Sequence, residues 1–538
     1  MPKAQSIAFD AGKNKMVDDM NREFRDKVCY AVGDVPHTTT YYEATGTVLP
    51  NPKSQKATFL ISSFRKLAGA YEEFKMDRAL QESFKAFQVR EPGVEGVHHQ
   101  CNTILKDVTY NITNVYGEHR ERLALVVLMT YHSPLFMEFN ETLIRGYLEV
   151  VVIGDTGTAK TTLAEAILRA TRLGQKITAS SSSRAGILYS LDDKINDKRV
   201  IRWGILPLND RQLILIDESQ KINEIEWGEM STVRERGLLQ VNRSVTGEHP
   251  AQTRLICLCN PSDYKSMTAH VFGVTALTFI PPPDLRRFDL AIVAAKDDVS
   301  MDVINELKVD KDSVPQSITP DLLNASVSWA WTRRPDQIKI VPAAARLIAD
   351  KAREFTSKYA SSDIPLVSMD MMAKLARLST SLAALLHSTD DTHEEIITQT
   401  EHVEYVCDLL TEIYDHKNCQ YDQYAQTQES ESGLNDQDYE EIVKAIEGAE
   451  EKEIYNESFQ SLFKMLLSTT SISRSDIVAR LDIGEKAVNQ RIKLLKHFRL
   501  VRTGKNGYIK TPRGIQFLKR YLLNLEDQPG TQRNVGTP

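Results

Sequence analysis

Residues 150–162 place an apolar run, two glycines, a lysine and two threonines in an order suited to phosphate binding: Val-Val-Val-Ile-Gly-Asp-Thr-Gly-Thr-Ala-Lys-Thr-Thr. Backbone N–H groups can approach phosphate oxygens around Gly154 and Gly157, and Lys160 can reach the β- and γ-phosphates. The Thr161 hydroxyl can bind Mg²⁺, and a helix that begins near Lys160 adds its positive N-terminal end. The pattern predicts a site for ATP and Mg²⁺ formed by Gly154, Asp155, Thr156, Gly157, Thr158, Ala159, Lys160, Thr161 and Thr162.

An acidic pair follows a second apolar run, in Leu-Ile-Leu-Ile-Asp-Glu at residues 213–218. Four consecutive apolar residues predict a strand buried on both faces, as in a parallel sheet. Asp217 and Glu218 then fall at its carboxyl end, where ligands bind in open α/β sheets. We expect Asp217 to hold Mg²⁺ together with Thr161, and Glu218 to polarise the water that attacks the γ-phosphorus.

Two further segments supply polar side chains that suit the same chemistry. The apolar strand expected at residues 255–259 ends at Asn260, whose amide could orient the attacking water or sense the γ-phosphate. Residues 281–290 read Pro-Pro-Pro-Asp-Leu-Arg-Arg-Phe-Asp-Leu and carry paired arginines. A guanidinium from such a loop can stabilise transition-state charge in the ATP site of a neighbouring subunit.

Together these segments resemble the minichromosome maintenance (MCM) branch of AAA+ ATPases. Ala159 stands where the usual P-loop has glycine before the lysine, and alanine at this position is the norm in that branch. Further matching segments are Val115-Tyr-Gly-Glu-His, Arg145-Gly-Tyr-Leu-Glu-Val, Gly204-Ile-Leu-Pro-Leu-Asn-Asp and Arg287-Phe-Asp-Leu. The last of these is similar to the arginine-finger motif and gives that role to Arg287. The motifs span roughly residues 107–415.

The resemblance implies an α/β fold: an AAA+ P-loop NTPase core, with a parallel sheet flanked by helices, at residues 107–317 and a helical lid at 318–424. It also implies a homo-oligomeric ring, usually a hexamer, with ATP bound between subunits and Arg287 supplied in trans. Pore hairpins of the family contact DNA. Residues 188–203, with Lys198 and Arg199, and residues 239–256, with Arg243, have hairpin character and are the candidates here.

One family feature has no clear counterpart. Alignment on Arg377-Leu-Ser places Asp370 where the family has a sensor-2 arginine. Either the alignment is displaced by a turn, or Arg377 or Lys374 takes the role, or the site works without it.

The amino-terminal 106 residues are shorter than the N-terminal half of full MCM proteins. Residues 39–66 alternate as two strands would, which indicates a reduced OB-like collar or a plain α+β domain. The six cysteines lack the paired spacing of a zinc site, so no zinc is expected. Cys257 and Cys259 alternate along one strand and are expected to be small core residues.

The carboxyl-terminal region contains a second basic candidate. Residues 457–525 resemble a winged helix, and residues 471–520 hold thirteen Lys/Arg against three Asp/Glu in a chain whose net charge is −7. This concentration of charge favours DNA contact through Lys486, Arg491 and Lys505, with protein docking as the alternative. Residues 425–456 are expected to be an acidic linker with some helix near 438–452, and residues 526–538 a disordered tail.

No window is apolar enough for a membrane span, and the start of the chain lacks an apolar signal stretch, so the sequence predicts a cytoplasmic protein. In a prokaryotic or viral host it would be associated with the nucleoid, and a nuclear location is the alternative. The family match favours an ATP-dependent helicase that acts on single-stranded and forked DNA in replication, with a loader or other replication proteins as further partners. The alternatives are an ATP-controlled replication initiator and, with less support, a protein-remodelling AAA+ ATPase.

Overall fold

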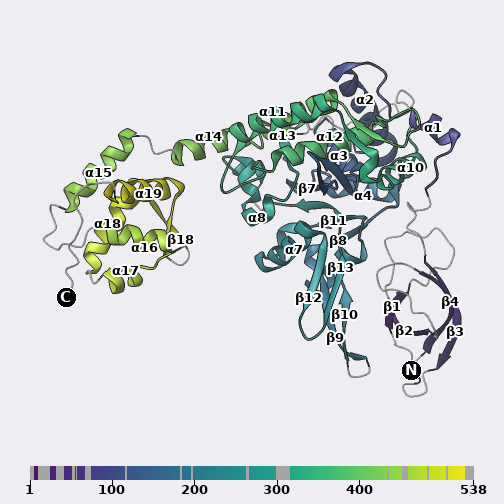
Figure 1. Ribbon diagram of the computed structural model, residues 1–538, viewed down its shortest axis with the longest axis horizontal. Helices are drawn as coiled ribbons and strands as arrows, with labels where there is room; N and C mark the ends of the chain where they lie inside the picture. The colour runs from purple at the N-terminus through teal and green to yellow at the C-terminus, as the bar shows by residue number, and fades with distance from the viewer. Residues whose placement is uncertain are drawn as a thin grey trace. The chain divides into compact units, whose positions relative to one another are not determined.

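The computed structural model describes most of the chain, and Figure 1 shows the arrangement of its elements. The described residues are 5–9, 25–31, 42–50, 55, 57–66, 74–115, 118–181, 184–195, 198–261, 266–298, 316–432, 436–450, 459–469, 471–481, 484–504 and 507–526. They form two compact units, residues 1–423 and 424–538, which are described separately below.

A five-stranded parallel sheet with the strand order β15-β7-β14-β11-β8 forms the centre of the first unit. Its strands are β7 (Glu149–Gly154), β8 (Gln175–Thr178), β11 (Leu213–Asp217), β14 (Arg254–Cys259) and β15 (Leu290–Ala294). Strands β7, β14 and β15 are buried along their whole length, as expected for apolar runs covered on both faces. The predicted α/β P-loop core is confirmed.

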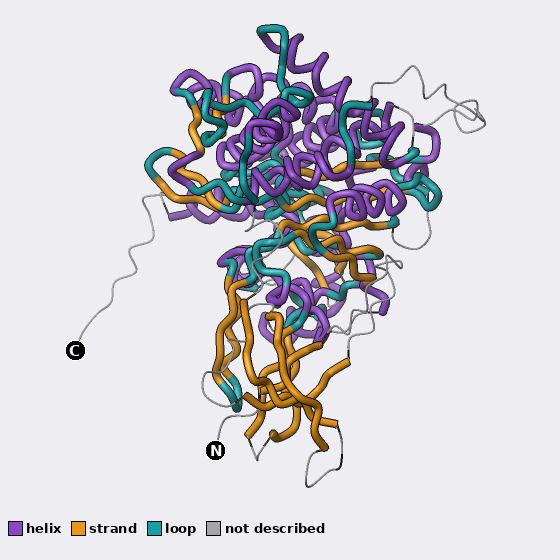
Figure 2. Tube along the Cα trace, turned by 90° about the vertical axis from the view of Figure 1, so that its right-hand side faces the viewer, coloured by secondary structure: helices purple, strands orange, loops and turns teal. Residues whose placement is uncertain are grey.

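Helices cover this sheet, and Figure 2 shows its orange strands passing between purple helices. The helices of the core are α2 (Gly93–Asp107), α3 (Glu118–His132), α4 (Lys160–Thr171), α5 (Arg184–Ile187), α6 (Ile205–Leu208), α7 (Glu224–Arg236) and α8 (Pro282–Leu285). Helix α1 (Arg78–Phe84) precedes them, and a small hairpin, β5 (Phe136–Phe139) with β6 (Thr142–Arg145), leads into β7.

Four helices lie where the sequence predicts a lid, after residue 318: α10 (Pro320–Trp331), α11 (Pro342–Tyr359), α12 (Met371–Leu385) and α13 (Thr400–Tyr414). Nearly every residue of α12 is buried, because it packs against α11, α13 and α3. A short parallel pair, β16 (Ile338–Ile340) and β17 (Ile396–Thr398), joins the loops between these helices.

Both expected hairpins are present. One pairs β9 (Tyr189–Ile195) with β10 (Lys198–Trp203), and the other pairs β12 (Leu238–Asn242) with β13 (Thr246–Pro250). They lie side by side and extend from the same end of the core (Figure 1). The ring of Trp203 lies 5.1 Å from that of His249, measured between centroids, so the two hairpins pack on each other.

The amino-terminal strands form a separate mixed sheet in the order β1-β2-β4-β3: β1 (Gln5–Phe9), β2 (Arg25–Ala31), β3 (Tyr42–Pro50) and β4 (Ala57–Lys66). The antiparallel β3–β4 pair confirms the two strands expected within residues 39–66. The described residues give four strands with one parallel pair, β2 with β4, whereas an OB barrel has five strands. The OB-like collar stays a prediction.

The second unit has the elements of a winged helix: α16 (Phe459–Ser468), α17 (Arg474–Leu481), α18 (Glu485–His497), β18 (Val501–Gly504), β19 (Gly507–Lys510) and α19 (Pro512–Glu526). Val488, Ile492 and Leu495 are buried on one stripe of α18, as expected. The predicted tail beyond residue 526 lies outside the described residues.

The expected acidic linker is largely helical, with α14 (Tyr421–Ser432) and α15 (Asp436–Glu450) in its place. Tyr439, Ile442 and Ile446 of α15 belong to the apolar core of the second unit. The helix expected near 438–452 is thus confirmed, but α15 is not a free part of a linker, because its apolar stripe packs on the winged helix.

Candidate nucleoside triphosphate site

The phosphate-binding turn connects β7 to α4, and its backbone explains its small residues. A Cβ at Gly154 would lie 2.1 Å from the carbonyl oxygen of Ala294 in the neighbouring strand, so only glycine fits. Gly157 has φ +87°. Ala159 has φ +62° directly before α4, the left-handed region in which an L side chain is strained. The loop therefore holds its shape with alanine at a position where glycine would be relaxed.

The Lys160 ammonium lies inside the turn. It donates hydrogen bonds of 2.8 Å to the carbonyl oxygens of Gly154 and Asp155, and of 3.2 Å to Thr158 Oγ1 and Asn260 Oδ1. Burial lowers the pKa of Lys160 to about 8, against the opposing effect of nearby anionic groups. The predicted partners Lys160 and Asn260 thus meet directly, at the carboxyl ends of β7 and β14.

Asp155 points away from the open turn. Its carboxylate accepts hydrogen bonds from the backbone N–H of Met267 at 2.9 Å, from Ser266 Oγ at 3.0 Å and from the backbone N–H of Lys296 at 3.0 Å. Because this side chain is buried, it ties the turn to the segments that follow β14 and β15. Its role in nucleotide binding would therefore be to shape the loop.

The acidic pair lies at the end of β11, next to the first turn of α4. Thr161 Oγ1 donates to Asp217 Oδ1 over 3.3 Å, and the backbone N–H of Glu218 donates to the same oxygen at 2.9 Å. A hydroxyl and a carboxylate in contact are the hard oxygen ligands that Mg²⁺ takes beside phosphates, so these residues fit the expected ion. Glu218 has φ +55°, an uncommon conformation for a side chain of this size.

Arg287 lies near the amino ends of the parallel strands, at the opposite end of the sheet from the phosphate-binding turn. It precedes β15, whose first residue, Leu290, pairs with Val150 at the start of β7, while the phosphate-binding turn follows the last residue of β7. Its Nη1 donates to Pro283 O at 2.5 Å and its Nη2 to Glu235 Oε2 at 2.8 Å. Because the strands are parallel, Arg287 is separated from the phosphate-binding turn of its own chain by the length of β7.

Comparisons with known proteins agree with this arrangement. Residues 93–308 match the family model described as the MCM P-loop domain. The DNA replication licensing factor MCM7 of Arabidopsis thaliana is 23% identical over 416 residues, 72% of this chain and 54% of that protein. The minichromosome maintenance protein MCM of Saccharolobus solfataricus is 25% identical over 293 residues, 52% of this chain and 41% of that protein. Over its P-loop core the chain is therefore similar to the MCM proteins.

The MCM-like chain spans about half the length, or less, of these two relatives. The matched segment begins at the first residue of α2 and ends beyond β15, so it contains the whole parallel sheet and both hairpins. The amino-terminal sheet and the winged helix lie outside that segment.

Two residues considered for the sensor-2 role, Lys374 and Arg377, have buried side chains. Lys374 Nζ donates to the carbonyl oxygens of Arg286 and Leu366 at 2.7 Å, and Arg377 binds Asp289 Oδ1 through Nε at 2.7 Å and Nη2 at 2.6 Å. Both side chains are buried and support the loop that carries Arg287. Because neither cation is exposed, a sensor-2 role for either one stays a prediction. Asp370, the aligned residue, lies 3.8 Å from Arg286 Nε.

The candidate DNA-binding residues of the MCM-like chain fall into three groups. Arg243 is exposed at the turn between β12 and β13, and Lys486 is exposed on α18. Lys198 and Arg199 begin β10, but their side chains lie outside the described residues, as does Lys505. The expectation for Arg491 was wrong: it is buried, with its guanidinium 5.4 Å from the ring centroid of Phe459, because it faces the core of the unit.

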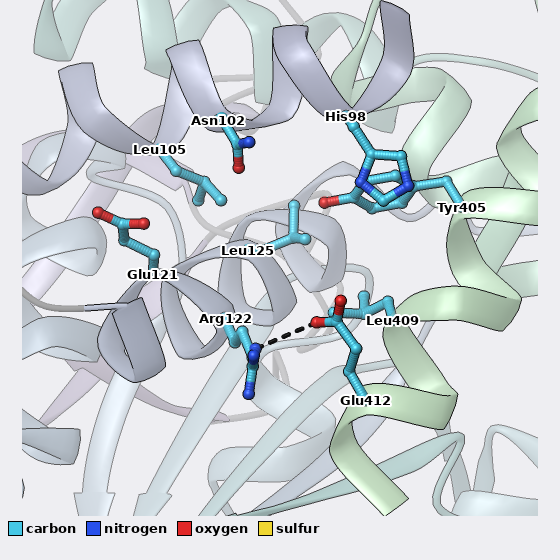
Figure 3. A pocket seen from close by; sticks show the side chains of 9 residues that line it. All are labelled: His98, Asn102, Leu105, Glu121, Arg122, Leu125, Tyr405, Leu409 and Glu412. Carbon is cyan, nitrogen blue, oxygen red and sulfur yellow. Dashed lines mark ion pairs between the residues drawn. The ribbon is translucent and has the colours of Figure 1, made fainter. Parts of the chain in front are cut away.

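A cavity of about 210 Å³ lies between α2, α3 and α13 (Figure 3). No residue of the phosphate-binding turn lines this cavity. Leu105, Leu125 and Leu409 form its apolar part, and an ion pair of 3.2 Å joins Arg122 Nε to Glu412 Oε2 at its edge. Its lining comes from two helices of the core and one helix of the region after residue 318, and it is not part of the triphosphate site.

Two residues near Asp217 escaped the sequence reasoning. Lys176 of β8 and Glu165 of α4 form an ion pair with each other, and Lys176 also binds Asp217. A lysine in an otherwise uncharged edge strand, and a glutamate four residues after Thr161, are the signals that would have found them.

All six cysteines, including Cys257 and Cys259, are buried and form no disulfides with one another. No group of three or more His, Cys, Asp or Glu residues is placed to hold a metal ion in the described part of the chain.

Proposed function

We propose that this MCM-like chain is an ATPase that couples hydrolysis to movement on DNA, and that it unwinds duplex DNA during replication. The observation that carries the proposal is the convergence of Lys160, Asp217, Glu218 and Asn260 at the carboxyl edge of one parallel sheet, in a domain that matches the MCM model. No helix in the described parts of the chain has the length and apolarity needed to cross a membrane.

The proposed chemistry assigns one task to each residue. Backbone N–H groups of the turn and Lys160 bind the phosphates, and Thr161 and Asp217 would hold Mg²⁺, which neutralises charge on the β- and γ-oxygens. Glu218 polarises the attacking water and accepts its proton. Asn260 orients that water or the γ-phosphate, and its backbone N–H is fixed by Gln220 Oε1 at 3.1 Å.

The arginine finger belongs to a shared site. Because Arg287 lies at the amino edge of the sheet and the phosphate-binding turn at the carboxyl edge, Arg287 is suited to the nucleotide of an adjacent subunit. Repetition of this head-to-tail contact closes a ring, for which a hexamer is the family expectation.

DNA would be contacted by the hairpins and the winged helix. Arg243 at the exposed tip of β12–β13 provides a cation that can follow phosphates irrespective of base, as a translocating protein needs. The exposed Lys486 of α18 suits a second contact with duplex DNA.

A strand-displacement assay tests the proposal. The protein, ATP and Mg²⁺ are added to fluorescently labelled forked duplexes with 3′ or 5′ tails, and release of one strand is measured. We expect ATP-dependent unwinding of one tail polarity and none with Lys160→Ala. Tight binding to one duplex sequence, with no unwinding of either fork, would instead favour the initiator.

A further inference from the structure

Lys176 lies between two carboxylates beside the predicted magnesium ligands. Its Nζ is 2.9 Å from Asp217 Oδ2 and 2.5 Å from Glu165 Oε1. The three side chains come from three elements, β8, β11 and α4, and are 16–23% exposed. Ion pairs of this kind, partly shielded from water and formed through charge-assisted hydrogen bonds, hold a carboxylate more firmly than a surface pair does.

The two oxygens of Asp217 have different partners. Oδ1 accepts from the Thr161 hydroxyl and from the backbone N–H of Glu218, whereas Oδ2 accepts from Lys176. Each oxygen is therefore fixed by a separate group, so the carboxylate cannot rotate without losing one of these contacts. Its Oδ1 edge is directed to Thr161, where Mg²⁺ would bind.

The fold explains why Lys176 reaches this carboxylate. In the parallel pair of β8 with β11, Lys176 lies beside Leu215, two residues before Asp217. Glu165 follows Thr161 by four residues on α4, so both project from the same face of that helix. The Thr161–Asp217 contact and the Glu165–Lys176–Asp217 contacts thus lie next to one another along α4 and β11.

We propose that Lys176, held by Glu165, is a positioning residue that orients Asp217 for Mg²⁺ binding. The ammonium does not itself contact the ion or the nucleotide; it fixes the far oxygen of a ligand, as the hydrogen-bonding partners of metal ligands commonly do. The inference rests on the proposed function, because it assumes that nucleotide is bound with Mg²⁺ at this site.

The test measures how nucleotide binding depends on Mg²⁺. A fluorescent ATP analogue is titrated into the full-length protein with EDTA, and then with increasing MgCl₂, for the natural chain and for Lys176→Met, Lys176→Arg and Glu165→Gln. Removal of a partner of a metal ligand typically costs about 10- to 100-fold in metal affinity. We expect the half-saturating Mg²⁺ concentration of Lys176→Met to rise by that factor, with binding in EDTA unchanged. Lys176→Arg should restore most of the effect.

Lys351→Met is the matched control. Lys351 lies on α11, is 33% exposed and pairs with Glu354 at 2.8 Å, so this variant makes the same chemical change at an ion pair away from the site. Its Mg²⁺ dependence should equal that of the natural chain. A thermal melt of each variant reports folding, and the titration in EDTA shows whether the phosphate-binding turn is intact.

Three results would overturn the inference. One is an unchanged Mg²⁺ dependence in Lys176→Met; a second is tighter Mg²⁺ binding, which would mean that the ammonium competes with the ion; a third is a loss that Lys176→Arg does not restore. If the natural chain binds the analogue equally with and without Mg²⁺, the proposed function itself fails. That outcome is distinct, because it is seen before any substitution is made.

Discussion

Arg287 and Lys160 lie at opposite ends of one parallel sheet. Lys160 follows the carboxyl end of β7, whereas Arg287 precedes the amino end of β15, the neighbouring parallel strand. A strand of six residues spans roughly 20 Å at about 3.3 Å per residue, so the guanidinium is far outside contact distance of a phosphate bound at Lys160 of the same chain. Both residues can serve one nucleotide only if two chains share it.

The proposed catalytic base can be removed with little change in shape. Glu218→Gln should still bind ATP but hydrolyse it about 10²- to 10⁴-fold more slowly, because the amide cannot accept the proton of the attacking water. Steady-state phosphate release and analogue binding measure the two properties. Glu224→Gln, an exposed position in the first turn of α7, is the control with the same chemical change. Normal turnover in Glu218→Gln would remove Glu218 from the mechanism.

The exposed hairpin tip makes a prediction for DNA binding. Arg243→Ala should weaken binding of labelled single-stranded DNA and flatten its dependence on salt concentration, because one phosphate contact in each subunit is lost. Fluorescence anisotropy over a series of KCl concentrations measures both effects. Arg353→Ala removes the same charge from an exposed position of α11 and should change neither. Equal salt dependence in both variants would place DNA elsewhere.

The strained turn residue makes a prediction about stability. Ala159 already bears the cost of left-handed backbone at φ +62°, about 1–2 kcal/mol. Ala159→Val should lower the free energy of unfolding by about 1 kcal/mol or more beyond that, because a β-branched side chain fits this conformation worse than alanine does. Ala159→Gly should stay within about 1 kcal/mol, since relief of strain offsets the greater freedom of glycine in the unfolded chain. Urea unfolding measures both variants. A valine variant as stable as the natural chain would contradict the assigned conformation.

Two buried histidines predict how stability depends on pH. Burial lowers the pKa of His132 and of His402 to about 4, against an ordinary value near 6.5. Between these values the unfolded chain binds more protons, so the free energy of unfolding rises with pH through this window and falls as pH drops from 6.5 to 4. The expected slope is about 1.4 kcal/mol per pH unit for each histidine.

Urea unfolding at pH 5 and pH 7 measures this slope. In the natural chain, the backbone N–H of Gln399 donates a hydrogen bond of 2.9 Å to His402 Nδ1. The asparagine of His402→Asn can accept this hydrogen bond but does not titrate, so the slope of this variant should be smaller. A slope unaffected by His402→Asn would show that the pKa of this histidine is the same in the folded and the unfolded chain.

The sequence was sufficient to predict the positions of residues that follow the carboxyl ends of strands. Asp217 and Asn260 end apolar runs, and parallel strands bring their carboxyl ends to one edge. The contacts of Asn260 with Lys160 and of Asp217 with Thr161 could therefore be foreseen. The β12–β13 hairpin around Arg243 could also be foreseen, since its pattern is local.

Residues whose roles depend on tertiary burial could not be predicted in this way. Arg491 looked like an exposed cation of a basic helix, yet it faces Phe459, which lies on another helix. Lys374 and Arg377 were candidates for a nucleotide contact, but Lys374 donates to Arg286 O and Arg377 to Asp289, both in the loop between α8 and β15. Lys176 meets Asp217 only through the register of two strands that are distant in sequence. Local pattern can mark such a residue, as the lysine in the otherwise uncharged strand β8 does, but it does not identify the partner.

Mixing two inactive variants tests the shared site most directly. Lys160→Ala keeps Arg287 but cannot bind phosphate, and Arg287→Ala keeps the phosphate-binding turn but lacks the guanidinium, so each alone should hydrolyse ATP very slowly. When the two are mixed and allowed to exchange subunits, sites that join the intact turn of one chain to the Arg287 of another should restore part of the ATPase rate. If the mixture stays as inactive as its components while subunit exchange is demonstrated, or if Arg287→Ala alone is fully active, the shared nucleotide site is contradicted.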